Sequence, residues 1–124
     1  MTDKPHKNLD AWKLSFEFVK HVYALTKNFP SEEKFGLISQ IRRASVSVPA
    51  NIAEGAGRKS PKEFLNFLSI ALGSVSELDT LLLLSKELEY ITEENCFDLL
   101  KKLDVIGKLI YGLMKKLGYL SNEK

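Results

Sequence analysis

Apolar residues recur in alternating steps of three and four along most of this 124-residue chain. This period places them on one face of an α-helix, and no segment has the alternating pattern of a strand. The pattern predicts four helices with short connections near residues 28–31, 56–60 and 90–92. Four helices joined in this way predict an all-α, up-down-up-down four-helix bundle.

The apolar positions of each segment define the face that we expect to form the core. In the first segment they are Leu9, Trp12, Phe16, Val19, Tyr23 and Thr26. In the second they are Leu37, Ile41, Ala44 and Val48. In the third they are Phe64, Leu68, Ala71, Val75, Leu78 and Leu82. In the fourth they are Cys96, Leu99, Leu103, Ile106, Ile110, Leu113 and Leu117.

Local signals mark where the helices begin and end. Ser31 is a candidate N-cap of the second helix, because two glutamates follow it and the helix dipole favours negative charge there. Ser60, followed by proline and by Glu63, predicts a capping box at the start of the third helix. Thr92 is the predicted cap of the fourth helix, which Gly118 ends. We expect the bundle to span residues 9–118, with a flexible tail over residues 1–8 and another over residues 119–124.

The stretch from residue 40 to residue 60 breaks the usual rules for a helix. Pro49 lies inside the apolar stripe, where a proline removes one backbone hydrogen bond and costs about 3 kcal/mol. Since the stripe continues to Ile52, we expect one helix, bent at Pro49, that runs to about Gly55. A second stripe at helical spacing is polar throughout: Gln40, Arg43, Ser47, Asn51, Glu54 and Arg58. Such departures usually mark function or assembly.

Several short sequence motifs in this region resemble a known family. They are Gly36-Leu37, Gln40-Ile41-Arg42-Arg43-Ala44, Pro49-Ala50-Asn51-Ile52-Ala53-Glu54-Gly55, Arg58-Lys59-Ser60, Glu63-Phe64 and Gly73-Ser74-Val75-Ser76-Glu77-Leu78. They resemble the bacterial four-helix-bundle family named for proteins encoded in intervening sequences of 23S ribosomal RNA genes. The resemblance runs from Leu9 to about Leu117 and is strongest over residues 40–78.

This resemblance implies a homopentameric bundle without an assigned catalytic reaction. A related branch is the accessory protein of the reverse transcriptase in diversity-generating retroelements, and there it binds RNA. The partners implied for this chain are therefore copies of itself and, as candidates, structured RNA or a reverse transcriptase. The chain's net charge of +2 is a departure from the basic retroelement branch.

Composition limits the classes of protein that fit. The hydrophobic fraction of 44% and the charged fraction of 27% are those of an ordinary globular domain. A single cysteine, Cys96, excludes an internal disulfide and fits a reducing compartment. The first seven residues lack the apolar region of a secretory signal, and the longest wholly apolar run, residues 81–84, is too short to span a bilayer. We expect a cytoplasmic protein without a membrane partner.

The outer faces of the helices differ in charge. Lysines seven residues apart are predicted on the outside of the first and fourth helices: Lys13, Lys20, Lys27, Lys101, Lys108 and Lys115. The backs of the second and third helices are small or uncharged, with one glutamate: Ser39, Val46, Pro49, Ala50, Ala53, Ser69, Gly73, Ser76, Glu77 and Thr80. Small residues let another backbone approach closely. We therefore expect these outer faces to form the interface of a homo-oligomer, except for Pro49, where we expect the helix to bend.

The residue types that carry chemistry do not form a familiar site. Glu17 and His21 lie one turn apart, but the Glu-x-x-His pairs of a di-iron bundle are missing. Arg58 separates Gly57 from Lys59, so the spacing of a phosphate-binding loop is broken. No nucleophile motif of a serine hydrolase occurs, and Cys96 sits at a core position. We therefore expect no enzyme activity, cofactor, metal or small-molecule substrate.

Glu54 and Glu77 leave two interpretations open. A carboxylate among small residues is either solvated or paired, because burying it alone costs several kcal/mol. We expect Arg43 or Arg58 to pair with Glu54, within or between subunits, while a carboxylate pair for acid–base work lacks a companion group. Two functions remain: an adaptor that binds RNA through the six lysines, and a protein-interaction scaffold without a nucleic-acid role.

Overall fold

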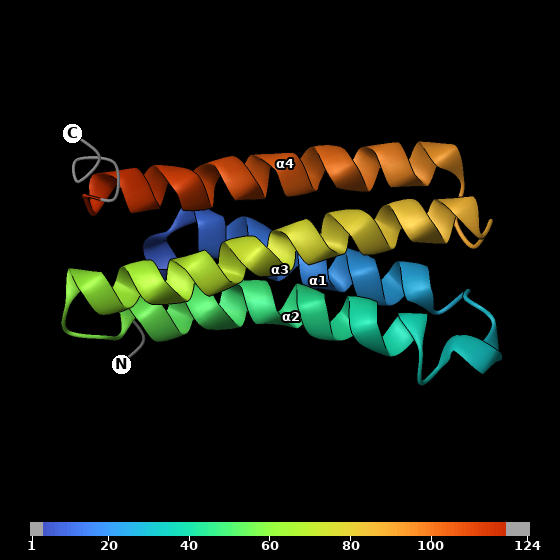
Figure 1. The fold of residues 1–124 in the computed structure, drawn as a ribbon, viewed down its shortest axis with the longest axis horizontal. Coiled ribbons are helices and arrows are strands. Elements are labelled where there is room, and N and C mark those ends of the chain that lie inside the picture. Colours follow the sequence, from blue (N-terminus) through green and yellow to red (C-terminus); the bar gives the residue numbers. More distant parts are fainter. Residues whose placement is uncertain (1–3, 119–124) are drawn as a thin grey trace.

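The fold is given by a computed structural model that describes residues 4–118. These residues form four α-helices and two short 3-10 helices and contain no strand. In chain order they are η1 (Pro5–Asn8), α1 (Asp10–Thr26), η2 (Ser31–Glu33), α2 (Leu37–Ala56), α3 (Pro61–Glu87) and α4 (Glu93–Lys116). Successive helices run in opposite directions (Figure 1). The predicted up-down-up-down bundle is confirmed.

Each helix packs against its neighbours in the chain, and α1 packs against α4 to close the bundle. The contact between α2 and α3 is the most extensive, and the contact between α1 and α4 is the least. Figure 1 shows α2 and α3 running side by side along their length. The α2–α3 pair therefore forms a tightly packed layer, and its outer surface faces away from α1 and α4.

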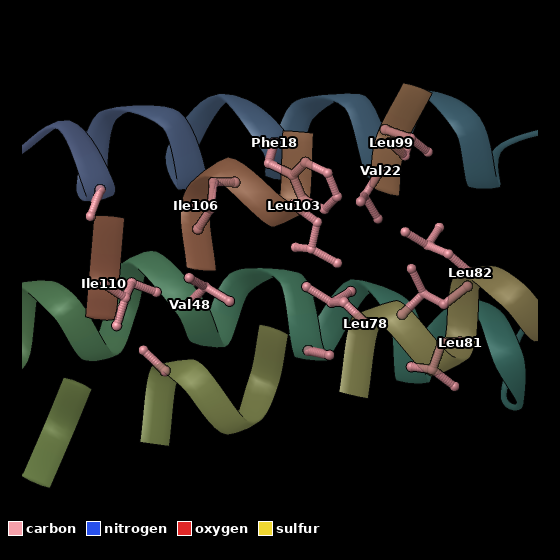
Figure 2. Packing of buried hydrophobic residues seen from close by; sticks show 14 of the residues in the cluster. Phe18, Val22, Val48, Leu78, Leu81, Leu82, Leu99, Leu103, Ile106 and Ile110 are labelled. Atoms are coloured by element: carbon pink, nitrogen blue, oxygen red, sulfur yellow. The ribbon is translucent and has the colours of Figure 1, made fainter. Parts of the chain in front are cut away.

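The core is an apolar cluster to which all four α-helices contribute (Figure 2). Ile41, Leu68, Leu78, Leu82 and Ile110 are completely buried. Burying a leucine or isoleucine side chain stabilises a fold by about 1.5–3 kcal/mol. The predicted core faces of the third and fourth helices are confirmed, with their end residues packed at the edge of the cluster.

The core face of α1 differs from the predicted one by a rotation about the helix axis. Its buried residues are Ala11, Ser15, Phe18, Val22 and Thr26. Phe16 and Tyr23, predicted in the core, are instead 48% and 40% exposed. Small Ala11 and Ser15 face the core, and the Ser15 hydroxyl is satisfied by donating to the Trp12 carbonyl at 3.1 Å. Of the other predicted positions in α1, Thr26 is buried and Trp12 and Val19 are half-buried, so the predicted face lies beside the observed one.

The second helix begins later than predicted. Ser31 starts η2 and makes no capping hydrogen bond with its side chain, so its predicted role as N-cap of α2 is wrong. The carboxylate of Glu33 accepts a hydrogen bond from the Leu37 backbone N–H at 3.1 Å instead. A side chain from the preceding turn therefore satisfies one of the unpaired donors at the start of α2.

Pro49 lies within α2 and does not end it, since the helix runs unbroken from Leu37 to Ala56. This continuation is as predicted. The side chain of Pro49 is buried, however, so its assignment to the outer back of the helix is wrong. Packing against the core holds both halves of α2 in one rod, which offsets the lost backbone hydrogen bond.

The predicted starts of α3 and α4 are confirmed by hydrogen bonds. The Ser60 hydroxyl accepts from the Glu63 N–H at 3.1 Å, and the Thr92 hydroxyl accepts from the Asn95 N–H at 3.0 Å. At the N-terminus, residues 5–8, which the sequence predicts as tail, form the helix η1, and His6 packs on Trp12 with ring centroids 4.9 Å apart. The predicted tail over residues 119–124 lies outside the described residues.

Candidate interaction surface

The polar stripe of α2 lies along the seam between α2 and α3. The hydroxyls of Ser47 and Ser74 form a hydrogen bond of 2.8 Å across this seam. Asn51 donates to the Ser47 carbonyl at 2.8 Å and to the Ser47 hydroxyl at 2.9 Å. Asn51 and Ser47 thus serve the packing of two helices within one subunit, and Ser74 is a partner that the sequence did not identify.

At the end of the same stripe, Glu54 pairs with Arg58. Their closest oxygen and nitrogen atoms are 2.6 Å apart, which selects Arg58 over Arg43 as the partner. Arg58 also lies 3.6 Å from the Glu63 carboxylate, and its guanidinium sits 4.9 Å from the centre of the Phe67 ring. About half of each side chain in the Glu54–Arg58 pair is exposed, so both charges remain solvated. This arrangement links the end of α2 to α3.

Gly55 marks the closest approach of α2 to α3. A Cβ atom built there would lie 2.8 Å from Phe64 Cδ1 and 2.8 Å from Phe67 Cβ. The sequence predicts only that the second helix runs to about Gly55. In the fold, its missing side chain is what allows the two helices to touch.

The residues predicted to form an oligomer interface fall on both sides of the polar seam. On α3, Ser69, Gly73, Ser76, Glu77 and Thr80 are all exposed. A Cβ atom on Gly73 would meet nothing within 4 Å, so the small residue is not required by packing within the subunit.

On α2, Ser39, Val46 and Ala50 are exposed and Ala53 is half-buried. Ser39 and Val46 border a groove between α1 and α2, whereas Ser76 and Thr80 border a groove between α3 and α4. The structure therefore places these residues toward two different grooves, one on each side of the seam. Of the polar stripe, Gln40 and Arg43 are exposed, and Arg43 lines the groove between α1 and α2.

The outer side of α3 is more apolar than a monomer requires. Ile70, Leu83 and Leu84 are 53%, 39% and 45% exposed. The most apolar 18 residues of α3 have a mean hydropathy of 1.6, yet only 39% of that window is buried. In length and composition α3 could cross a membrane. The core helix of a soluble protein has the same properties, so a single helix of this kind does not define a membrane span.

The six lysines predicted on α1 and α4 are all exposed. Lys20 lies 3.2 Å from Glu17, and Lys108 lies 3.3 Å from Asp104, so nearby carboxylates offset part of their charge. Within residues 4–118, none of Lys13, Lys27, Lys101 and Lys115 makes an ion pair, and the Lys101 ammonium lies 5.5 Å from the centre of the Phe97 ring. Of the six lysines, Lys13, Lys27 and Lys115 therefore pair with neither a carboxylate nor an aromatic ring in this range, and their charge is the most available to an anionic partner.

Of the residues considered for chemistry, Glu17 and His21 are exposed on α1 and Cys96 is buried. Glu17 faces Lys20, and no group of three His, Cys, Asp or Glu side chains among residues 4–118 is placed to hold a metal ion. Cys96 is buried, its thiol lies 3.6 Å from the Leu82 carbonyl, and burial raises the pKa of that thiol. A raised pKa disfavours the thiolate, which is the nucleophilic form of cysteine.

Fold and surface together define a class of protein: an all-α four-helix bundle in which polar residues of α2 contact α3. The chain belongs to the 23S rRNA-intervening sequence protein family, whose model matches residues 7–112. It is also similar to a crystal structure of a protein with unknown function from the S23 ribosomal protein family of Bacteroides thetaiotaomicron. The two chains are 33% identical, and the match covers 85% of this chain and 95% of the other with a TM-score of 0.79.

The resemblance inferred from the sequence motifs is thus confirmed. A comparison with curated proteins gave no significant match. Neither the family description nor that of the related structure names a catalytic reaction.

Proposed function

We propose that this protein is a non-enzymatic scaffold of the cytoplasm that assembles with copies of itself through the outer faces of α2 and α3. The observation that carries the proposal is the exposed face of α3, where Gly73 lies in open space between small and apolar side chains. A glycine inside a helix costs about 1 kcal/mol relative to alanine, and no contact within the subunit requires it here. Close approach of the backbone of a second subunit gives a physical reason for a glycine at position 73. The family resemblance favours a closed ring of five subunits.

Self-assembly is tested by native mass spectrometry or light scattering at micromolar concentration. We expect an oligomer for the wild type, and smaller species for Gly73→Lys or Ser76→Lys, because a lysine there puts charge and bulk into the contact. Gly112→Lys is the matched control, since Gly112 also lies in open space but on α4. A wild-type protein found only as a 14.0 kDa monomer would contradict the proposal.

A second candidate function is that of an adaptor that binds structured RNA, alone or together with a reverse transcriptase. The exposed lysines of α1 and α4 favour it, above all Lys13, Lys27 and Lys115, which no carboxylate offsets in the described chain. One subunit offers few such charges. An oligomer repeats them, so several can reach one folded RNA and raise a weak affinity by avidity.

The adaptor role is tested by titrating a fluorescent structured RNA with protein at about 50 mM and about 200 mM salt. We expect affinity to fall steeply with salt, and a Lys13→Gln, Lys27→Gln, Lys115→Gln variant to bind more weakly while keeping its oligomeric state. If no binding occurs at the lower salt with the oligomer intact, the scaffold without a nucleic-acid role is the better description.

A further inference from the structure

The groove between α1 and α2 combines cationic and aromatic side chains. Its volume is about 600 Å³, and its lining includes Tyr23, Lys34, Phe35, Ile38, Arg42 and Arg43. Three of its described lining residues are cations and none is a carboxylate. Since the whole chain carries a net charge of only +2, this groove concentrates positive charge in one place. Such a groove is complementary to an anionic partner.

An aromatic ring stands open to water at this groove. Phe35 lies between η2 and α2 and is 90% exposed, more than any other large apolar residue described. The ammonium group of Lys34 lies 5.6 Å from the centre of the Phe35 ring. Exposing a phenylalanine is unfavourable, and nothing in the subunit covers it. A bare ring beside a cation offers a flat surface for stacking and a charge for a phosphate.

Arg42 is held in place without losing its charge. Its Nε donates to the Thr26 hydroxyl at 2.8 Å, and its guanidinium lies 4.4 Å from the centre of the Tyr23 ring. A terminal nitrogen also lies 3.4 Å from the Tyr23 carbonyl. None of these partners is anionic, so Arg42 contributes an unneutralised positive charge to the lining of the groove. Arg43, one residue further along α2, is exposed to solvent.

We propose that this groove binds single-stranded nucleic acid, with a base stacked on Phe35 and the flanking phosphates held by Lys34, Arg42 and Arg43. A chain of phosphates with exposed bases matches both the local charge and the open ring, whereas an acidic peptide matches only the charge. The site is separate from the lysines of α1 and α4 and does not depend on the binding of structured RNA by them. Ser39 and Val46 border both this groove and the proposed assembly face, so binding is measured on the intact oligomer.

The test uses fluorescence anisotropy with oligouridine of about ten nucleotides, and an abasic oligomer of the same length. We expect wild type to bind oligouridine more tightly than the abasic strand. Phe35→Ala should weaken binding of oligouridine about ten-fold and leave binding of the abasic strand unchanged, because only bases stack. Arg43→Gln should weaken binding of both strands and reduce the slope of log affinity against log salt by about 0.7.

Phe97→Ala is the matched control, because Phe97 is 62% exposed and lies 5.5 Å from the Lys101 ammonium, but on α4. We expect it to bind oligouridine as wild type does, and circular dichroism to show full helicity for every variant. Equal binding by wild type and Phe35→Ala overturns the proposal. So does competition by oligoglutamate as strong as that by oligouridine. The variant that combines Lys13→Gln, Lys27→Gln and Lys115→Gln gives a third outcome. If it no longer binds oligouridine while Phe35→Ala and Arg43→Gln bind it fully, the proposal is overturned and binding is assigned to the lysines.

Discussion

Gly55 and Phe67 bring α2 and α3 together, because a Cβ atom on Gly55 would lie only 2.8 Å from the Cβ of Phe67. A contact that short does not occur between real side chains, so the crossing exists only with glycine at this position. Gly55 ends the run over residues 51–55 that carries the most specific part of the family resemblance. The motif therefore encodes, at this residue, how closely two helices pack.

Replacing Gly55 with alanine should destabilise the fold by about 1–3 kcal/mol, because the added methyl group forces α2 away from α3. Gly112→Ala is the matched control. Its Cβ would meet nothing within 4 Å, so alanine should stabilise α4 by about 1 kcal/mol. Urea unfolding at fixed protein concentration measures both changes. Stabilisation by both substitutions would show that the close approach at Gly55 is absent in solution.

Replacing Glu54 with alanine should cost about 0.5 kcal/mol, because the pair with Arg58 is half exposed and water screens it. A pair buried between subunits would behave differently, since its removal leaves an uncompensated charge and costs about 3 kcal/mol. Thermal unfolding at several protein concentrations separates the two cases. A loss near the larger value, at concentrations where the oligomer is intact, would place Glu54 in a subunit contact.

Replacing Glu89 with glycine should stabilise the protein by up to about 1 kcal/mol. Glu89 has a positive φ of 66°, and it follows the end of α3 at the position where glycine is usual. The Tyr90 N–H donates to the Ser85 carbonyl and the Glu89 N–H to the Lys86 carbonyl, which is the hydrogen-bond pattern of a Schellman motif.

The matched control for Glu89 is Glu87→Gly, two residues earlier and inside α3. There the backbone is helical, so glycine should cost about 1 kcal/mol. Opposite signs for the two substitutions in urea unfolding would confirm the left-handed conformation at Glu89. Loss of stability in both would contradict it.

The bundle could be predicted from the sequence because its signals are local. The caps at Ser60 and Thr92 and the core faces of α3 and α4 each depend on residues within a turn or two of one another. The face of α1 could not be fixed in this way. Phe16 and Tyr23 are larger than Ala11 and Ser15, and only the distance to the neighbouring helices decides which pair is buried.

The candidate surfaces were predicted less well for the same reason. Arg58 was one of the two predicted partners of Glu54, and it lies one helical turn from it. The remaining contacts involve residues of α3, namely Glu63, Phe67 and Ser74. No local sequence pattern pairs these residues with those of α2. The exposure of the Phe35 ring was likewise not predicted from the sequence. Phe35 lies in a turn, where helical spacing carries no information about exposure.

Tyr90 and Glu33 join the turn before α4 to the start of α2, and this link should respond to alkaline pH. The Tyr90 hydroxyl donates to the Glu33 carboxylate at 2.9 Å, and the other oxygen of that carboxylate accepts from the Leu37 N–H. The hydrogen bond to Glu33, followed by desolvation and the charges of Glu33 and Glu32, raises the pKa of Tyr90 above its ordinary value of 10.0. The folded protein therefore keeps the phenol proton at a pH where the unfolded chain loses it.

Because the folded state binds this proton more tightly, the stabilisation is present below the unfolded pKa and is lost as pH rises through the folded pKa. We expect Tyr90→Phe to be less stable than wild type at neutral pH, and the difference in free energy of unfolding to shrink above about pH 10. The phenylalanine keeps the packing on the ring of Phe29, whose centroid lies 5.3 Å from that of Tyr90. Urea unfolding from neutral to alkaline pH, at fixed protein concentration, measures the difference.

Glu33→Gln provides the control for this pH dependence, since it removes the negative charge that Tyr90 faces but keeps a side-chain oxygen near Leu37. In this variant the pKa of Tyr90 should fall towards its ordinary value, which a titration of tyrosinate absorbance can follow against Tyr90→Phe as the blank. A stability difference between wild type and Tyr90→Phe that stays constant through the alkaline range would show that the hydrogen bond to Glu33 does not form in solution. So would a Tyr90 titration unchanged by Glu33→Gln, because the carboxylate is the first cause of the raised pKa.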